Sequence, residues 1–285
     1  MGFLHRSQLT VSTPAASALV VPLSLVNSEL GTSGIDTKLT RLIRAVSALF
    51  ASPEGLDREW ARQTWVELLP GRGGDTMLLS RWPIESISSI TDGAGSTVTS
   101  STYSIQGPRR DRVYRDSEWA LNAVPIAPFS SVTGGAEPDY TVTYKAGWLP
   151  PGGTARGAGT LTTWAAATAY VSGEFVKSST EGNNSLLLEC TTAGTSDSTE
   201  PTWPSAAADT VTDNAATWTA RTASELPDEL QEAALIQVES LYRGDPKTGG
   251  NTKRERVGPI ETEWFAAADQ TALVPAVASI LRMYR

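Results

Sequence analysis

The sequence predicts an α+β fold: a helical host with a small antiparallel sheet, plus an inserted all-β module. Three observations carry this prediction. Apolar residues recur at the helical period over residues 36–50, apolar and polar residues alternate over 140–145, and between residues 156 and 222 the composition shifts to mainly Thr, Ala, Ser and Gly. Because a further helix pattern follows this block, we expect it to interrupt one domain. The host then comprises residues 1–155 and 223–285, and the inserted module residues 156–222.

The N-terminal part of the host is predicted to be helical after a flexible, polar arm over residues 1–20. A short helix is expected over residues 23–30, where Gly31 can end it. A longer helix follows Asp36, which can cap its first turn, and stops before Pro53. Its apolar residues fall on one stripe: Leu39, Leu42, Ile43, Val46, Leu49 and Phe50.

The middle of the host predicts the strands of the small sheet. A turn is expected at Asp92-Gly93. Candidate strands cover residues 62–69, 77–82, 84–90, 98–105 and 112–114. The clearest strand lies at residues 140–145, where three large side chains face one way: Tyr140, Val142 and Tyr144.

After the block the sequence returns to helices. Pro227 suits the first turn of a helix that Gly244 ends. Its apolar face contains Leu230, Ala233, Ala234, Val238 and Leu241. A polar loop over residues 247–256 carries four basic side chains, and a short helix over 275–284 closes the chain. The loop is interpreted either as solvated or as an arm that becomes ordered on an acidic or nucleic-acid partner.

Composition excludes several classes of protein. The chain of 285 residues has a formal net charge of −8, and the block alone has three basic and seven acidic side chains, so neither part is predicted to bind nucleic acid. The single cysteine, Cys190, excludes an intrachain disulfide. Since no run of about 18 apolar residues occurs, no membrane span is expected.

The sequence contains no recognisable group of catalytic residues. The only histidine, His5, lies in the N-terminal arm, and Cys190 has no histidine or asparagine partner that the sequence identifies. No Cys/His cluster and no phosphate-binding Gly-rich loop are present. We therefore predict a protein that is not an enzyme and uses no metal or cofactor. A pair of carboxylates that meets only in the folded chain is the remaining enzymatic alternative.

The order of the host segments resembles the head–tail connector (adaptor) proteins of tailed bacteriophages. The matching pieces are the helices at 23–30 and 36–50, the strands at 62–67 and 78–90, Val-Thr-Tyr-Lys-Ala-Gly-Trp at 142–148, Leu-Pro-Asp-Glu-Leu at 226–230 and Leu-Arg-Met-Tyr-Arg at 281–285. The resemblance implies a structural virion protein of the neck, assembled in the bacterial cytoplasm. It implies a ring of about twelve copies that joins the capsid to the tail beneath the portal.

Several partners follow from this resemblance: further copies of the chain, the portal protein, the next neck or tail protein, and DNA that passes through the channel without specific binding. Residues 244–285 would form the portal-docking segment, and deletion of residues 248–285 is expected to abolish docking while the fold survives. The docking residues would be Lys253, Arg254, Arg256, Trp264, Leu281, Tyr284 and Arg285.

The block resembles small carbohydrate-binding-like β modules of phage structural proteins and the chitin-binding modules of secreted hydrolases. The resemblance rests on Trp164, Tyr170, the Glu-Pro-Thr-Trp-Pro run at 200–204 and Trp218. These aromatic residues have two interpretations. They form the core of a small domain, or Trp203 and Tyr170 form a platform for a host surface glycan. The second interpretation supports an alternative function, a secreted sugar-binding protein in which the block is the working part.

Overall fold

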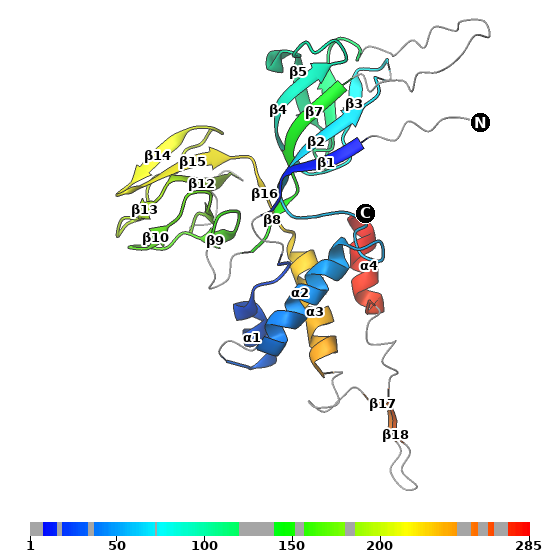
Figure 1. Ribbon diagram of the computed structural model, residues 1–285. Coiled ribbons are helices and arrows are strands. Elements are labelled where there is room, and N and C mark those ends of the chain that lie inside the picture. The colour runs from blue at the N-terminus through cyan, green and yellow to red at the C-terminus, as the bar shows by residue number, and fades with distance from the viewer. Residues whose placement is uncertain are drawn as a thin grey trace, which may run out of the picture. The chain divides into compact units, whose positions relative to one another are not determined.

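The computed structural model describes residues 8–15, 19–33, 37–71, 73–119, 140–151, 157–179, 186–243, 252–255, 262–264 and 273–285 (Figure 1). The chain divides into two compact units. The first, here called the β unit, comprises Met1–Ala15, Ala61–Trp148 and Arg221–Ser224. The second unit comprises Ala16–Trp60, Leu149–Ala220 and Glu225–Arg285. Of the helices in the described ranges, none is both long and apolar enough to cross a membrane.

The predicted helical host with a small sheet is wrong. Strands hold more of the described residues than helices do, and the host contains two antiparallel sheets rather than one small one. The structure is therefore predominantly β, and mixed α+β at most. Most host strands were predicted from the sequence, but local patterns did not show that they assemble into two sheets, and they did not reveal β1.

The larger sheet of the β unit has four antiparallel strands. Their order is β1 (Gln8–Thr13), β2 (Gln63–Leu69), β7 (Tyr140–Ala146) and β4 (Ile84–Asp92). The prediction of a flexible arm is wrong for residues 8–13, which form the edge strand β1. Because the side chains of β1 are almost all exposed, the strand is held mainly by its ladder with β2 and leaves no hydrophobic pattern in the sequence.

The smaller sheet has the order β3 (Thr76–Leu78), β6 (Arg112–Arg115) and β5 (Tyr103–Gln106), and a short 3₁₀ helix, η1 (Ser100–Thr102), precedes β5. Both sheets contribute to one hydrophobic core. Trp65, Tyr144 and Ile90 enter it from the larger sheet, and Met77 and Val113 from the smaller one. The described part of the β unit is therefore two sheets packed on a shared core.

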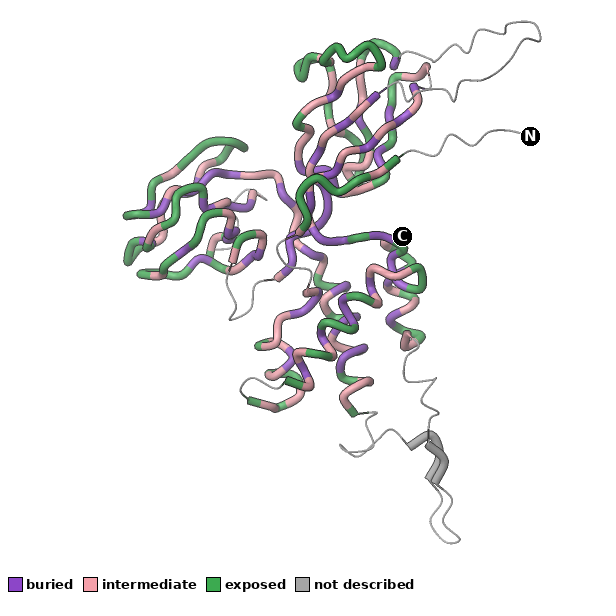
Figure 2. Tube along the Cα trace, in the orientation of Figure 1, coloured by how far each residue is buried: buried purple, intermediate pink, exposed green. Residues whose placement is uncertain are grey.

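Strand β7 is the centre of the larger sheet and confirms the alternation read from the sequence. Tyr140, Val142 and Tyr144 are buried, and buried residues (purple) alternate with half-buried ones (pink) along β2 and β7 in Figure 2. Since β7 pairs with both β2 and β4, it joins segments that lie far apart in the chain.

Four helices lie in the second unit. They are α1 (Leu23–Leu30), α2 (Thr37–Ala51), α3 (Asp228–Arg243) and α4 (Pro275–Met283). The predicted stripe of α2 is confirmed, with Leu39, Ile43, Val46 and Phe50 buried. Gly31 ends α1 with a left-handed φ of 63°, as the sequence indicated. Helix α3 packs against each of the other three helices.

The block forms its own sheets. A five-stranded sheet has the order β14 (Thr210–Asp213), β15 (Ala216–Arg221), β12 (Leu187–Thr192), β11 (Phe175–Lys177) and β9 (Leu161–Thr163), and β10 (Ala169–Tyr170) pairs with β13 (Gly194–Thr195). Among the described residues, two further short strand pairs lie outside these sheets. Strand β8 (Trp148–Leu149) pairs with β16 (Ser224–Glu225), and β17 (Thr252–Glu255) pairs with β18 (Thr262–Trp264). The domain boundaries at residues 156 and 222 stay a prediction.

A buried carboxylate sits in the core of the β unit. Glu67 of β2 is fully buried and accepts hydrogen bonds from the Ser80 backbone N–H at 3.0 Å, from the Ser80 hydroxyl, and from the Tyr144 hydroxyl at 2.7 Å. Burial, followed by the charge and hydrogen bond of Glu67, raises the pKa of Tyr144 far above its ordinary value, so the phenol remains a donor. Glu67 thereby links β2, β7 and the chain after β3.

We expect Tyr144→Phe to lower the free energy of unfolding by about 2 kcal/mol, because a buried hydrogen bond to a carboxylate is lost. Urea unfolding followed by tryptophan fluorescence measures this change. Tyr103→Phe, at a half-buried tyrosine of the same unit, is the matched control and should stay within about 0.5 kcal/mol of the wild type. Equal effects of the two substitutions would contradict a special role for the Glu67 network.

Candidate functional site

The best-defined polar site of the β unit is built on a β-bulge. Strand β4 pairs with β7 at Ile84, Ser86 and Ile87, and the register shifts between Ile84 and Ser86, which leaves Glu85 as the extra residue. A bulged residue is not paired in the ladder, so its carbonyl oxygen is open to other donors. This bulge, with a second one between Ile87 and Ser89, also explains why Ile84, Ile87 and Ile90 recur every third residue in a strand.

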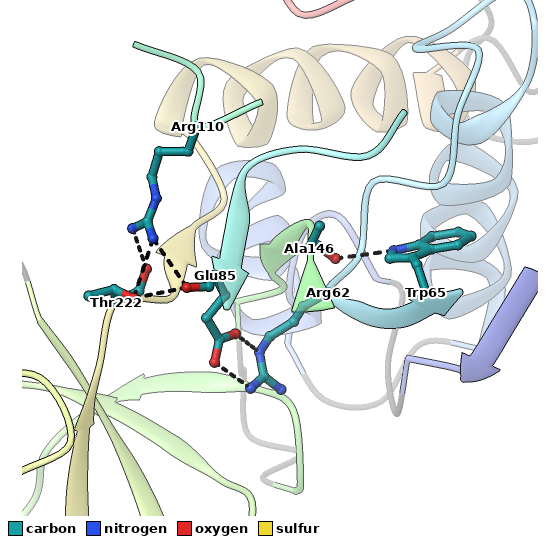
Figure 3. Close-up of polar contacts among 6 residues, drawn as sticks. All are labelled: Arg62, Trp65, Glu85, Arg110, Ala146 and Thr222. Carbon is teal, nitrogen blue, oxygen red and sulfur yellow. Dashed lines mark hydrogen bonds and ion pairs between the residues drawn. The ribbon is translucent and has the colours of Figure 1, made fainter. Parts of the chain in front are cut away.

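The Glu85 carbonyl receives two donors from distant parts of the chain (Figure 3). The Thr222 hydroxyl donates to it at 3.1 Å and the Arg110 guanidinium at 3.2 Å. Arg110 also donates to the Thr222 carbonyl at 2.9 Å. Three segments therefore meet at one bulge. Thr222 is the last residue of the predicted block, so the chain is fixed where it returns from the block.

Arg110 is placed for this role by a strained backbone. Its φ is 52°, a left-handed conformation that costs a non-glycine residue about 1–2 kcal/mol. Burial lowers the pKa of Arg110, and the nearby Glu85 carboxylate opposes that shift. An arginine stays protonated in either case, so its fork of donors remains complete. The hydrogen bonds to Glu85 and Thr222 offset the backbone strain.

The Glu85 side chain forms a second contact on the same bulge. Its carboxylate accepts two hydrogen bonds from Arg62, one from Nε and one from Nη2, the latter at 3.0 Å. The side chains of Arg62 and Glu85 are 14% and 6% exposed, so water screens this pair weakly. Nearby, the Trp65 indole N–H donates to the carbonyl of Ala146 at 3.4 Å (Figure 3).

In the second unit, the C-terminal residue Arg285 hydrogen-bonds to the turn that follows α2. The Arg285 guanidinium donates to the carbonyl oxygens of Pro53, Glu54 and Gly55 at 2.6–2.7 Å. Only glycine fits at position 55, because a Cβ there would lie 2.4 Å from the carbonyl oxygens of residues 49 and 50. These contacts form what we call the C-terminal clasp.

Tyr284 adds two contacts to the clasp. Its carbonyl accepts a hydrogen bond from Arg58 at 2.8 Å, and its hydroxyl donates to Glu229 of α3 at 3.1 Å. Burial, then the hydrogen bond and charge of Glu229, raise the pKa of Tyr284. Leu281 of α4 is buried. Helix α4 is therefore held as part of the helical group.

The portal-docking residues named from the sequence divide into two sets. Leu281, Tyr284 and Arg285 all make contacts within the second unit. Lys253 and Arg254 lie in β17 and Trp264 in β18, while Arg256 lies outside the described residues, as does His5. The structure places Tyr284 and Arg285 in the clasp and buries Leu281 on α4. The docking role of both sets stays a prediction.

The aromatic residues of the block form one hydrophobic core. Trp218 is fully buried, and Tyr170 and Trp203 pack edge-on against it at ring-centroid distances of 4.8 and 6.0 Å. The buried carboxylate of Asp213 accepts hydrogen bonds from the indole N–H groups of Trp164 at 2.9 Å and Trp218 at 3.0 Å. This arrangement gives a small β module a core with its polar atoms paired.

The side chain of Trp203 is held by a hydrogen bond to Glu200. Its indole N–H donates to Glu200 at 2.6 Å, and the same carboxylate accepts hydrogen bonds from Ser178 and Ser179. Partial burial acts to raise the pKa of Glu200, but the hydrogen bonds from Ser179, Trp203 and Ser178 outweigh it and lower the pKa. The Glu200 contacts therefore stabilise the module above the ordinary carboxyl pKa, and this stabilisation is lost as the pH falls through the folded-state pKa.

The two residues named as a sugar platform are core side chains in this structure. Trp203 is 8% exposed and Tyr170 is 2% exposed, so neither offers an open ring face on which a pyranose could stack. Sugar binding by the block stays a prediction. Cys190 is buried in the same core, and burial, with the charges of Glu174 and Glu189, raises the pKa of its thiol to about 11. A thiol in this state is a poor nucleophile at neutral pH.

Sequence reasoning missed the bulge site. Arg62, Glu85, Arg110 and Thr222 carry no shared motif, and they meet only because β4 is bulged and the chain returns at Thr222. One signal was present, the three-residue spacing of isoleucines in a strand, which a regular ladder cannot accommodate. Over the described ranges, no group of three or more His, Cys, Asp or Glu side chains could hold a metal ion.

Comparison with models of known protein families and with curated proteins found no match for this chain.

Glu85→Ala should lower the free energy of unfolding by about 3 kcal/mol, because it leaves a largely buried arginine without its partner. Arg62→Met combined with Glu85→Leu should cost less than the sum of the single changes. A double-mutant cycle in urea measures the coupling, with the exposed Glu118→Ala as the control. Additive effects would show that the two side chains are energetically independent.

Trp203→Ala should destabilise the block by about 3–5 kcal/mol, the range for truncation of a buried tryptophan. Thermal unfolding of the full chain, with Val171→Ala as an exposed control, measures this. Screening the same variants on a glycan array separates the two interpretations of Trp203. Wild-type stability combined with loss of glycan binding would identify Trp203 as a binding residue instead of a core residue.

Proposed function

We propose that this chain is a structural protein of the bacteriophage neck, a head–tail connector that forms a ring under the portal and joins the capsid to the tail. The observation that carries the proposal is the way the block is inserted. The backbone N–H of Leu226 donates to the carbonyl of Leu149 at 3.2 Å, and β8 pairs with β16. The host segments that flank the block are thus adjacent, so removal of the block would leave a continuous host.

The order of elements in that host supports the proposal. Helices α1 and α2, strands β2, β4 and β7, and helices α3 and α4 follow one another in the order on which the connector resemblance rests. An insertion whose ends meet adds little constraint to the host, because the entropy of closing a loop grows slowly with its length. The predominance of strands changes the expected proportions of the host and leaves this order intact.

Charge and polar contacts are consistent with a ring around DNA. The net charge of −8 disfavours non-specific adhesion of a nucleic acid that must pass through the channel. The polar groups described above, at Glu85 and at the C-terminal clasp, hydrogen-bond parts of the chain to one another. This use of charged side chains suits a protein whose role is to hold a shape.

The clasp changes how the docking segment must be tested. Deletion of residues 248–285 would remove α4, whose Val277 and Leu281 are buried, and would also remove the contacts of Arg285. The fold would therefore not survive that deletion unaltered, contrary to the sequence-based expectation. A sharper variant replaces residues 246–271 with a Gly-Ser linker of equal length and keeps α4.

The linker variant should unfold at the same temperature as the wild type, because the described helical contacts remain, and should fail to bind portal. Electron microscopy and sedimentation of the wild-type chain, alone and with a portal protein, should show closed rings of about twelve copies. The control variant Glu118→Ala, at an exposed residue outside the docking segment, should retain both docking and thermal stability. A folded wild-type chain that never joins the portal would exclude the connector role.

A further inference from the structure

Helices α1 and α3 of the second unit border a groove of about 80 Å³. Its floor is apolar, with Val26 and Leu30 from α1 and Leu235 and Ile236 from α3. Val26 is buried and the other three are half-buried, so the floor is partly open. Its volume suits a single aliphatic side chain.

The rim of this groove is acidic. Glu29 of α1 and Glu232 and Glu239 of α3 line it, and all three are exposed. Glu239 is already paired with Arg243 at 2.8 Å, one turn along the same helix. Glu29 and Glu232 thus line the same groove from different helices, beside its apolar floor. An occupant that fits this surface carries basic side chains next to an aliphatic one.

Such a sequence occurs in the chain itself. Residues 247–257 contain four basic side chains, one acidic side chain and, at the end, an aliphatic one: Lys247, Lys253, Arg254, Glu255, Arg256 and Val257. Arg256 lies thirteen residues beyond Arg243, the end of α3, so an extended chain could span roughly 45 Å to reach it. That reach exceeds the length of α3 itself, about 24 Å for 16 residues, so the segment can extend beyond its own helix.

We infer that the acidic groove between α1 and α3 binds the basic segment 247–257 of a second copy of this chain. The two surfaces differ, so the contact is heterologous, and repeated heterologous contacts close into rings when the rotation permits. The inference rests on the proposed ring and names the contact between its neighbours. Val257 would enter the apolar floor, and Lys253 and Arg254 would pair with Glu29 and Glu232.

Two complementary variants test the inference. The groove-reversed chain carries Glu29→Lys and Glu232→Lys, and the segment-reversed chain carries Lys253→Glu and Arg254→Glu. Sedimentation velocity at low ionic strength should show that the wild type self-associates and each variant alone does not, because like charges meet. An equimolar mixture of the variants should associate again. Glu59→Lys with Glu118→Lys, which make the same charge change at exposed residues that do not line the groove, should behave as the wild type.

A peptide-binding assay tests the same contact even if the wild-type chain assembles only on the portal and not in free solution. A fluorescent peptide of residues 246–258 is titrated into the segment-reversed chain, whose own segment cannot compete. Reversal of Glu29 and Glu232 should weaken peptide binding about tenfold, and Val257→Ser in the peptide should weaken it further. Failure of the peptide to bind, or equal binding of a scrambled peptide, overturns the inference. If both charge-reversed variants still form wild-type rings, the inferred groove contact is wrong and the proposed ring is retained. If no ring forms on the portal but the peptide binds specifically, the proposed ring is wrong and the groove contact is retained.

Discussion

The β-bulge at Glu85 is the local constraint on which the connection between host and block depends. Glu85 is the extra residue of this edge strand and has no Cα partner in β7. At the bulge, the Glu85 carbonyl accepts hydrogen bonds from Thr222 and Arg110, and the Glu85 carboxylate accepts them from Arg62. One extra residue therefore fixes three segments that are distant in sequence.

This constraint explains how a long insertion is tolerated. The chain must leave the host and re-enter it at neighbouring positions on either side of an inserted module. The free energy of this closure depends on the contacts that hold the two flanking segments together. Here the hydrogen bond from Leu226 to Leu149 and the contacts of Thr222 hold them, so the host is ordered on both sides of the block. The module then needs only to supply its own core, which Trp218, Tyr170 and Asp213 provide.

Local periodicity accounts for what the sequence could predict. The stripe of α2 and the alternation of β7 depend on neighbouring residues, and both were predicted correctly. Strand β1 could not be predicted, because its side chains are exposed and it depends on backbone pairing with β2. Glu67 and the bulge at Glu85 also escaped prediction. A carboxylate in a strand is normally placed facing solvent, and only the tertiary structure shows which donors surround it.

Position within a fold also limits what a family resemblance can say about single residues. Arg285 and Trp203 were both named for contacts with other molecules, yet each is engaged within the chain, Arg285 by three carbonyl oxygens and Trp203 by Glu200 and Trp218. A side chain that already satisfies its donors must break those bonds before it binds a partner, and that cost lowers its affinity. Charged side chains at an apolar groove carry no such cost when they remain in water. Surface complementarity is for this reason a better guide to the partner contacts of this chain than the identity of its aromatic and terminal residues.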